Sequence, residues 1–217
     1  MEKIKAFVVN RNLVTTLKNT VEFLQKEPRI EVVVFDQVST YPPLLDYYKE
    51  SGITVVYSQT NGGPNSVWGS DLKPHFNNNH FIVADSDCLY DEVPNDWLDK
   101  MLHVLNTTSI FKVGFSLEID DLPDTEIANQ AKVWERRYWT DKTDLGWKAH
   151  IDSTFCLYRP NSSFSYDAIR LDKPYCIKHA PWYLTKDNIT EEWLYYIDNI
   201  TGLSTWGSKI KYLYHKS

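Results

Sequence analysis

Two carboxylates at the end of a short apolar segment are the residues of this chain best placed to do chemistry. Residues 81–84 (FIVA) predict a buried strand, and Asp85, Ser86 and Asp87 follow it directly. Side chains alternate along a strand, so Asp85 and Asp87 would point the same way if the chain stays extended through Ser86. Neighbouring carboxylates repel each other unless a cation lies between them. The spacing suggests oxygen ligands for Mg²⁺ or Mn²⁺, although a strand followed by an Asx-rich turn gives the same pattern.

The segments before this motif alternate between strand and helix patterns. Residues 4–9, 30–35 and 53–57 predict strands, and residues 14–24 and 44–50 predict helices between them. This β-α-β-α-β order calls for parallel strands joined by right-handed crossovers. In such sheets the ligand sits beyond the carboxyl ends of the strands. We therefore expect a nucleotide pocket at the polar strand ends, which are Asn10-Arg11, Asp36-Gln37 and Ser58-Gln59.

A glycine-rich loop follows the third predicted strand. Residues 61–65 (NGGPN) allow the backbone to approach a ligand closely. The sequence contains neither GxGxxG nor GxxxxGK, so a dinucleotide-binding fold and a P-loop NTPase are both disfavoured.

The second half of the chain mixes the two patterns. Residues 97–105 and 127–139 predict helices, and residues 110–117 and 153–159 predict strands. Residues 143–150 are polar and contain a glycine, so we expect a mobile loop there, just before Asp152. His179 precedes the proline-bounded aromatic segment APWY, where a fixed loop would bring it to the metal. A lone histidine is more often structural or exposed.

Composition narrows the class of protein. A chain of 217 residues suits one large α/β domain. The net charge of −6 and pI near 5.5 disfavour nucleic acid as a partner. Three cysteines without CxxC spacing suggest neither a disulfide framework nor a zinc site, and they favour a reducing compartment. No apolar run has the length of a membrane span, and no signal peptide pattern begins the chain. We expect a cytoplasmic protein, free or peripheral at a membrane face.

The arrangement resembles a nucleotide-sugar glycosyltransferase of the GT-A type. The resemblance rests on the β/α first half, on the DxD motif Asp85-Ser86-Asp87, and on blocks whose order is similar to that in a group of bacterial and viral glycosyltransferase-like proteins. These blocks are FIVADSDCLYDEVPNDWL, KVGFSLEIDDLPD, VWERRYW, IDSTFCLYRP and AIRLDKPYCIKHAPWY. The resemblance implies a single α/β domain with a mainly parallel, Rossmann-like central sheet flanked by helices. Residues 1–105 would bind the nucleotide-sugar, and residues 106–217 would face the acceptor.

The resemblance also implies roles for individual residues. Asp85, Asp87 and His179 would bind Mn²⁺ or Mg²⁺, and the ion would neutralise charge on the departing nucleoside diphosphate. The nucleotide-sugar would contact Asn10, Arg11, Asp36, Asn61, Gly62, Asp85, Ser86 and Arg136, although Arg136 and Arg137 equally suit exposed ion pairs on a helix.

An inverting reaction, which the resemblance favours, needs a carboxylate that takes the proton from the acceptor hydroxyl. Asp152 is our choice for this catalytic base. Asp120 and Asp121 are the competitors, although a solvated turn is the more ordinary role for both. Trp134, Trp182 and Tyr183 would stack on sugar faces or fill the core.

The sequence departs from the common family-two pattern at two places. Residues 35–39 (FDQVS) stand where an Asp-Asn-Gly-Ser-Thr turn is frequent, and a clear Glu-Asp motif for the base is missing. The leading hypothesis is transfer of a sugar from a nucleoside-diphosphate sugar, with a UDP-sugar favoured, to a glycan or lipid-linked acceptor in polysaccharide biosynthesis. The alternatives are a sugar-phosphate nucleotidyltransferase and a non-catalytic carbohydrate-binding domain.

Overall fold

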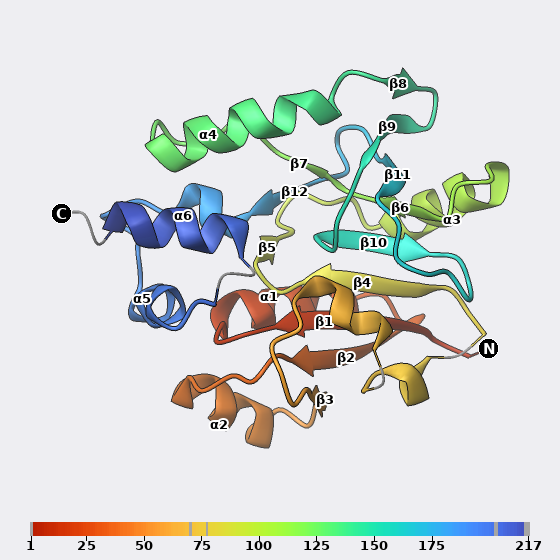
Figure 1. Ribbon diagram of the computed structural model, residues 1–217. Coiled ribbons are helices and arrows are strands. Elements are labelled where there is room, and N and C mark those ends of the chain that lie inside the picture. The colour runs from red at the N-terminus through yellow and green to blue at the C-terminus, as the bar shows by residue number, and fades with distance from the viewer. Residues whose placement is uncertain (1, 70, 77, 202–203, 215–217) are drawn as a thin grey trace.

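Strands from both halves of the chain join one mixed sheet. The computed structural model describes residues 2–69, 71–76, 78–201 and 204–214, and Figure 1 shows helices on both faces of the sheet. The sheet has nine strands in the order β3-β2-β1-β4-β10-β6-β11-β9-β8. This architecture confirms the predicted α/β fold class.

The first half of the chain supplies the parallel part of the sheet. Strands β3, β2, β1 and β4 lie side by side and run in one direction. The apolar residues of β1, β2 and β4 are mostly buried, those of the edge strand β3 are half-buried or exposed, and the helices between the strands bury one apolar face each. The elements are β1 (Ile4–Asn10), α1 (Thr15–Gln25), β2 (Ile30–Asp36), α2 (Pro42–Glu50), β3 (Thr54–Tyr57), the short 3-10 helices η1 (Pro64–Trp68) and η2 (Lys73–His75), and β4 (Phe81–Asp85).

The second half extends this sheet with antiparallel pairs. Strand β10 runs antiparallel to both β4 and β6, and β11 pairs with β6 in parallel and with β9 in antiparallel orientation. The elements are α3 (Trp97–Thr107), β6 (Lys112–Gly114), α4 (Glu126–Glu135), η3 (Arg136–Tyr138), β8 (Lys142–Thr143), β9 (Gly146–His150), β10 (Phe155–Tyr158), β11 (Asp167–Arg170), η4 (Ala180–Tyr183), α5 (Glu191–Asp198) and α6 (Thr205–Tyr214).

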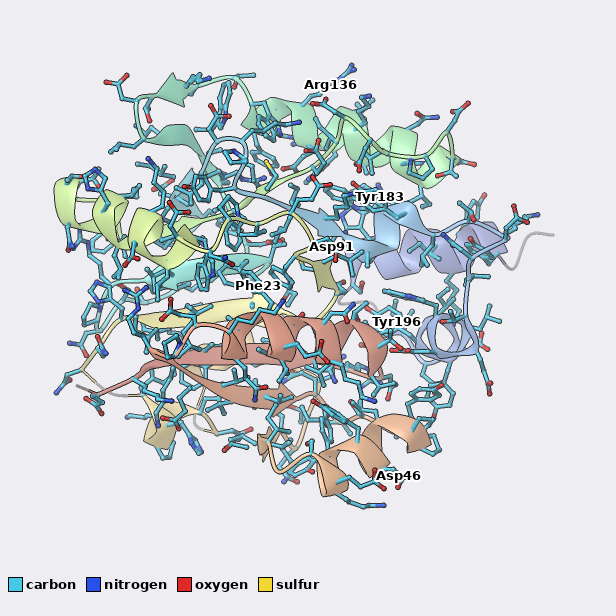
Figure 2. All side chains as sticks on the ribbon, turned by 180° about the vertical axis from the view of Figure 1, so that it is seen from behind. Phe23, Asp46, Asp91, Arg136, Tyr183 and Tyr196 are labelled. Atoms are coloured by element: carbon cyan, nitrogen blue, oxygen red, sulfur yellow. The ribbon has the colours of Figure 1, made fainter. Side chains whose placement is uncertain are left out.

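Three short strands from distant parts of the sequence form a small second sheet. It consists of β5 (Cys88–Leu89), β12 (Cys176–His179) and β7 (Ser116–Leu117), in that order. The predicted strand over residues 110–117 is therefore two strands in two sheets, because β6 pairs with β10 and β7 pairs with β12. Stacked aromatic rings, among them Phe23 on Tyr90 and on Trp97, fill the space on the side of α1 seen in Figure 2.

The expected mobile loop at residues 143–150 is instead part of a β-hairpin. Strands β8 and β9 pair with each other, and β9 pairs along its length with β11. Gly146 has a φ of +136°, and a Cβ at this position would lie 2.2 Å from the carbonyl oxygen of Arg170. The glycine permits close packing of two strands, which is a second use of glycine besides a flexible loop. The predicted helix over residues 127–139 likewise ends at Glu135 and continues as the 3-10 turn η3.

A buried carboxylate helps to attach the C-terminal helices to the first half of the chain. Glu192 of α5 accepts hydrogen bonds from Val14 N (2.5 Å), Thr15 N (2.9 Å) and Thr15 Oγ1 (2.6 Å). The side chain thus caps the N-terminus of α1, where a negative charge is favourable, from a position 177 residues later. Among the described residues, no helix is both long and apolar enough to cross a membrane.

We predict that Glu192→Ala lowers the free energy of unfolding by about 2 kcal/mol, because it removes a helix cap and leaves buried N–H groups unpaired. Glu191→Ala, at the exposed neighbouring position, is the matched control and should change stability by less than about 0.5 kcal/mol. Urea unfolding of both variants measures the difference. Equal stability of the two variants would contradict this role for Glu192.

Candidate active site

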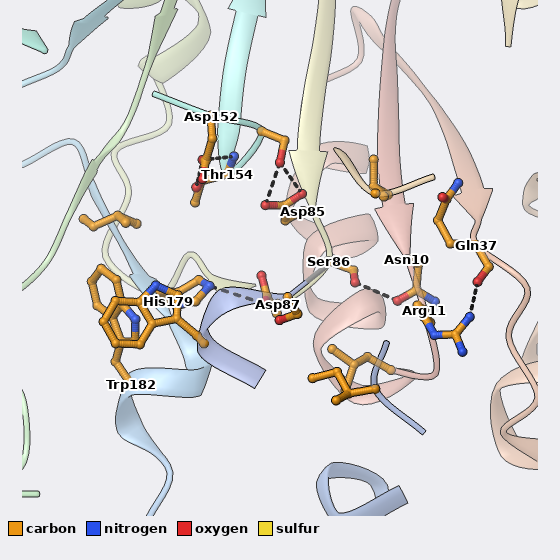
Figure 3. Close-up of a pocket in the computed structure, with 18 of the residues that line it drawn as sticks. Asn10, Arg11, Gln37, Asp85, Ser86, Asp87, Asp152, Thr154, His179 and Trp182 are labelled. Carbon is orange, nitrogen blue, oxygen red and sulfur yellow. Dashed lines mark hydrogen bonds and ion pairs between the residues drawn. The ribbon is translucent and has the colours of Figure 1, made fainter. Parts of the chain in front are cut away.

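The polar ends of the central parallel strands meet at one cavity of about 530 Å³. Strand register explains the meeting, because Asn10 pairs with Asp36 on one side of β1, and Val9 pairs with Asp85 on the other. The carboxyl ends of β1, β2 and β4 therefore lie at one edge of the sheet, as in other open α/β sheets. Figure 3 shows the residues that line this cavity.

Asp85 and Asp87 both line the cavity, although the strand does not continue between them. Strand β4 ends at Asp85, and Ser86 and Asp87 form a turn. The turn is tied to its neighbours on both sides, because Ser86 N donates to Val9 O and Ala180 N donates to Asp87 O. These bonds fix where the two carboxylates lie.

His179 reaches the same place through strand pairing. Strand β12 pairs with β5 so that His179 lies opposite Cys88, the residue after Asp87. His179 Nε2 is 3.3 Å from Asp87 Oδ2. Asp87 Oδ1 and His179 Nδ1 are both buried and form no hydrogen bond within the described part of the chain. Trp182 is 1% exposed and packs edge-on against the imidazole, with ring centroids 4.8 Å apart, so its ring holds the orientation of His179 (Figure 3).

The loop between β9 and β10 brings Asp152 to the opposite wall. Ser153 Oγ donates to both oxygens of Asp85, at 2.9 and 3.0 Å, and Asp85 N donates to Thr154 O. Asp152 Oδ1 accepts from Thr154 N and Thr154 Oγ1, as drawn in Figure 3. Asp152 is exposed and lines the cavity, and its charge acts on Asp85.

A buried lysine that the sequence analysis missed holds this loop. Lys112 is fully buried in β6, and its Nζ donates to the carbonyl oxygens of Ile151 (2.5 Å) and Asp152 (3.2 Å) and lies 3.2 Å from Tyr158 Oη. Burial lowers the pKa of Lys112, and the nearby negative charge of Asp152 opposes this shift. An isolated lysine inside an apolar strand offers no sequence signal for such a role.

Some residues predicted to contact the nucleotide line the cavity, and others lie behind its wall. Asn10, Arg11, Asn61 and Ser86 line the cavity. Asp36 lies beneath it, where its carboxylate accepts from Tyr48 Oη (2.9 Å) and Ser39 N (2.9 Å). The same buried network continues through Tyr48, Asn10 and Ser86, because Asn10 Nδ2 donates to Tyr48 Oη and Ser86 Oγ donates to Asn10 Oδ1.

Two further predicted contacts lie outside the cavity wall. Arg136 is exposed at the outer end of α4 (Figure 2), and Gly62 donates its N–H to Gln37 Oε1 instead of facing the cavity. The Arg11 guanidinium does line the cavity, but it already donates to the carbonyl oxygens of Gln37 and Val38 and to that of Asn199 in the C-terminal segment.

Of the alternative acidic residues and the predicted aromatic contacts, only the two tryptophans line the cavity. Asp120 and Asp121 lie away from the cavity wall and form ion pairs with Lys173 and Lys178. Tyr183 Oη donates to Asp121, so Tyr183 also belongs to this outer network. Trp134 and Trp182 both line the cavity.

Sequence reasoning also missed the far end of the cavity and its C-terminal wall. Ser153 directly follows Asp152, so this neighbour was its only signal, whereas Gln37 was already among the expected polar strand ends. Further lining residues come from α4, from η3, from residues 150–170 and from the C-terminal helices, and they include Glu135, Tyr138, His150, Phe164, Tyr166, Arg170, Tyr196 and Trp206.

Similarity to known proteins is confined to solved structures. No protein-family model matches the chain, and no curated protein sequence matches it. TarS from S. aureus, solved over its residues 1–349, aligns with 18% identity and a TM-score of 0.44, covering 72% of this chain and 47% of that one. The inositol-1-phosphate CTP transferase from T. maritima aligns with 10% identity and a TM-score of 0.45, covering 86% of this chain and 94% of that one.

A third similar structure spans the whole chain. The 4-diphosphocytidyl-2C-methyl-D-erythritol synthase from Anaerococcus prevotii aligns with 12% identity and a TM-score of 0.38, with full coverage of both chains. This chain thus spans about half of the TarS fragment and nearly all of the other two proteins.

The electrostatics of the site predict how stability changes with pH. Burial, together with the charges of Asp87 and Asp152, holds the pKa of Asp85 well above its ordinary value of 3.8. Between pH 3.8 and this raised pKa, the folded protein therefore binds more protons at Asp85 than the unfolded chain, so ionisation of Asp85 lowers stability as pH rises through this window.

We predict that Asp85→Asn raises the melting temperature in metal-free buffer at pH 8 by at least about 2 °C, which corresponds to roughly 1 kcal/mol in a chain of this size. The gain should shrink toward pH 4, and the exposed control Asp91→Asn should show none. Thermal unfolding in EDTA measures both variants. A melting temperature that falls at pH 8 would contradict the repulsion described here.

Proposed function

We propose that the chain is a metal-dependent glycosyltransferase that takes its sugar from a nucleoside-diphosphate sugar, with a UDP-sugar favoured. The observation that supports this proposal is the shared cavity. The polar ends of the parallel strands, the acidic pair Asp85 and Asp87, His179 and the acidic loop at Asp152 all line it. A nucleotide at the strand ends would extend its diphosphate toward the acidic pair, and the acceptor would enter on the side of Asp152.

The donor atoms suit a divalent cation that is shared with a diphosphate. Among residues 2–69, 71–76, 78–201 and 204–214, no group of three or more His, Cys, Asp or Glu side chains forms a complete metal cluster. Mg²⁺ and Mn²⁺ commonly use one or two carboxylates and complete their coordination with phosphate and water. Asp87 Oδ1 is a buried carboxylate oxygen without a hydrogen-bond partner in the described part of the chain, and burial together with the neighbouring acids raises the pKa of Asp85. Both features fit a site that gains a cation together with the nucleotide.

In this proposal Asp87 and His179 hold the cation, with Asp85 beside it. The bound ion would neutralise the charge that develops on the departing nucleoside diphosphate. The hydroxyl of Ser153 fixes the carboxylate of Asp85 through a hydrogen bond shared between its two oxygens, and Trp182 packs against the imidazole of His179. The chain therefore orients its charged groups before the donor binds, which lowers the reorganisation needed in the transition state.

Asp152 is the proton acceptor of the proposal. Thr154 donates two hydrogen bonds to Oδ1, and Lys112 holds the Asp152 backbone, so this carboxylate has a fixed place on the acceptor side. A carboxylate in this position takes the proton from the attacking hydroxyl as the bond to the donor sugar forms on the opposite face from the leaving group. This arrangement corresponds to inversion at the anomeric carbon.

We predict that UDP binds in the presence of Mn²⁺ and that EDTA weakens the binding by at least about tenfold. Asp87→Ala should lose the Mn²⁺-dependent part, because its oxygens are the proposed ligands, whereas the exposed control Asp91→Ala should bind like the wild type. Calorimetric titration with UDP, GDP and CTP measures the affinities, and circular dichroism checks the fold of each variant.

The same titrations separate the competing functions. Tight binding of CTP or UTP, with product formation from a sugar phosphate, would identify a nucleotidyltransferase instead. Sugar binding that is indifferent to nucleotide and to EDTA would identify a carbohydrate-binding domain. Either result would contradict the proposed function.

We predict that Asp152→Asn lowers turnover of the UDP-sugar by about 10² to 10⁴-fold, because it removes the proton acceptor. Affinity for UDP with Mn²⁺ should stay within about twofold of the wild type, since the amide preserves the hydrogen bonds from Thr154. Release of UDP from a panel of UDP-sugars measures turnover. Asp121→Asn is the control, because Asp121 pairs with Lys178 outside the cavity. Unchanged turnover in Asp152→Asn would exclude it as the base.

A further inference from the structure

A buried ion pair stands at the end of the cavity away from the nucleotide side. Glu135, the last residue of α4, is 1% exposed, and Arg170, the last residue of β11, is 6% exposed. Arg170 Nη1 donates to Glu135 Oε1, and Arg170 Nε and Nη2 both donate to the carbonyl oxygen of His150, at 2.9 and 2.6 Å. The Tyr138 ring lies 4.3 Å from the guanidinium carbon. The positive charge of Arg170 is thus already used within the protein.

The carboxylate of Glu135 keeps one oxygen for a ligand. Arg170 contacts Oε1, and no hydrogen bond to Oε2 is formed by any residue that the structure describes. Burial raises the pKa of Glu135 to about 7, and Asp152 adds to this shift, whereas Arg170 and His179 oppose it. The contacts within the protein therefore offset only part of the desolvation free energy of this carboxylate. A hydroxyl group that donates to Oε2 would offset it.

Aromatic rings frame this end of the cavity. Phe164 and Tyr166 form an edge-to-face pair with centroids 4.9 Å apart, and both line the cavity together with Tyr138. Tyr166 is 53% exposed although its ring contacts Phe164 and His150, so part of the ring remains accessible to a ligand. The flat C–H face of a sugar ring can pack on such a ring, while its hydroxyls reach polar neighbours.

The charges here are wrong for a phosphate. Glu135 and Asp152 both face this end, and Arg170, the cation beside them, is held by Glu135 and by a carbonyl oxygen. A phosphate monoester would lie near two carboxylates, the guanidinium of Arg170 is already paired, and like charges in a partly dry cavity repel strongly. A neutral hydroxyl group avoids this cost.

We propose that this end of the cavity, formed by Glu135, Tyr138, His150, Phe164, Tyr166 and Arg170, binds the ring of an uncharged acceptor sugar. Glu135 Oε2 accepts a hydrogen bond from one hydroxyl of this sugar, and Tyr166 packs on the ring. The inference rests on the proposed function, and it deepens it, because it selects a neutral sugar over a sugar phosphate or lipid phosphate as the second substrate.

Ligand-observed NMR on the full chain with saturating UDP and Mg²⁺ tests this proposal. The probes are the methyl glycosides of glucose, galactose, mannose and N-acetylglucosamine, and the 1-phosphates of the same four sugars. We expect at least one methyl glycoside to bind and its 1-phosphate to bind more weakly. Glu135→Gln should weaken glycoside binding by about tenfold, because the charged hydrogen-bond acceptor is lost. Tyr166→Ala, at an exposed position that leaves the ion pair intact, should weaken it about threefold to tenfold.

Glu126→Gln is the matched control, because Glu126 lies exposed in the first turn of the same helix. It should bind the glycoside like the wild type. The proposal is wrong if UDP binds and no glycoside does, if the sugar phosphates bind more tightly than the glycosides, or if Tyr166→Ala and Glu135→Gln both bind the glycoside normally. If UDP and Mg²⁺ themselves fail to bind in a parallel calorimetric titration, the proposed function is the part that fails, and this inference fails with it.

Discussion

Repulsion between carboxylates at the edge of the sheet is the constraint around which this structure is built. Asp85 lies near both Asp87 and Asp152, and burial makes the repulsion stronger. The fold holds these groups together by bonds from elsewhere in the chain. Ser153 donates to Asp85, and Lys112 fixes the backbone at Asp152. Such an arrangement costs stability, and proteins tolerate this cost where a site needs it.

The parallel and the mixed part of the main sheet form different walls of the cavity. The parallel strands bring their polar carboxyl ends together, which suits a nucleotide with its diphosphate. Beyond β4 the sheet contains strands of both directions, so the chain returns to the same edge with longer connections that carry Asp152, Phe164 and Tyr166. The C-terminal helices add a third wall through Tyr196 and Trp206, held in place by the bond from Glu192 to α1.

Local patterns predicted the first half of the fold well and the second half only in part. Strands β1, β2 and β4 and helices α1, α2 and α3 lie where hydrophobic periodicity indicated, because each buries a regular apolar face. The prediction of a mobile loop at residues 143–150 was wrong, because polar composition and a glycine are equally typical of a hairpin at the sheet edge. Residues 110–117 form two strands, because their pairing partners lie far along the chain.

The sequence alone determined the α/β class and the acidic motif after β4, because both follow from short-range periodicity and from residue types at strand ends. Tertiary structure decided which other groups share the cavity. His179 lies beside Asp87 because β12 pairs with β5, and Glu135 faces the cavity because Arg170 of β11 holds it. Asp36 lies beneath the cavity floor because Tyr48 and Ser39 bind it there. The contacts of Glu135 and His179 join residues at least 35 positions apart, so they depend on how the whole chain packs, and no local pattern encodes them.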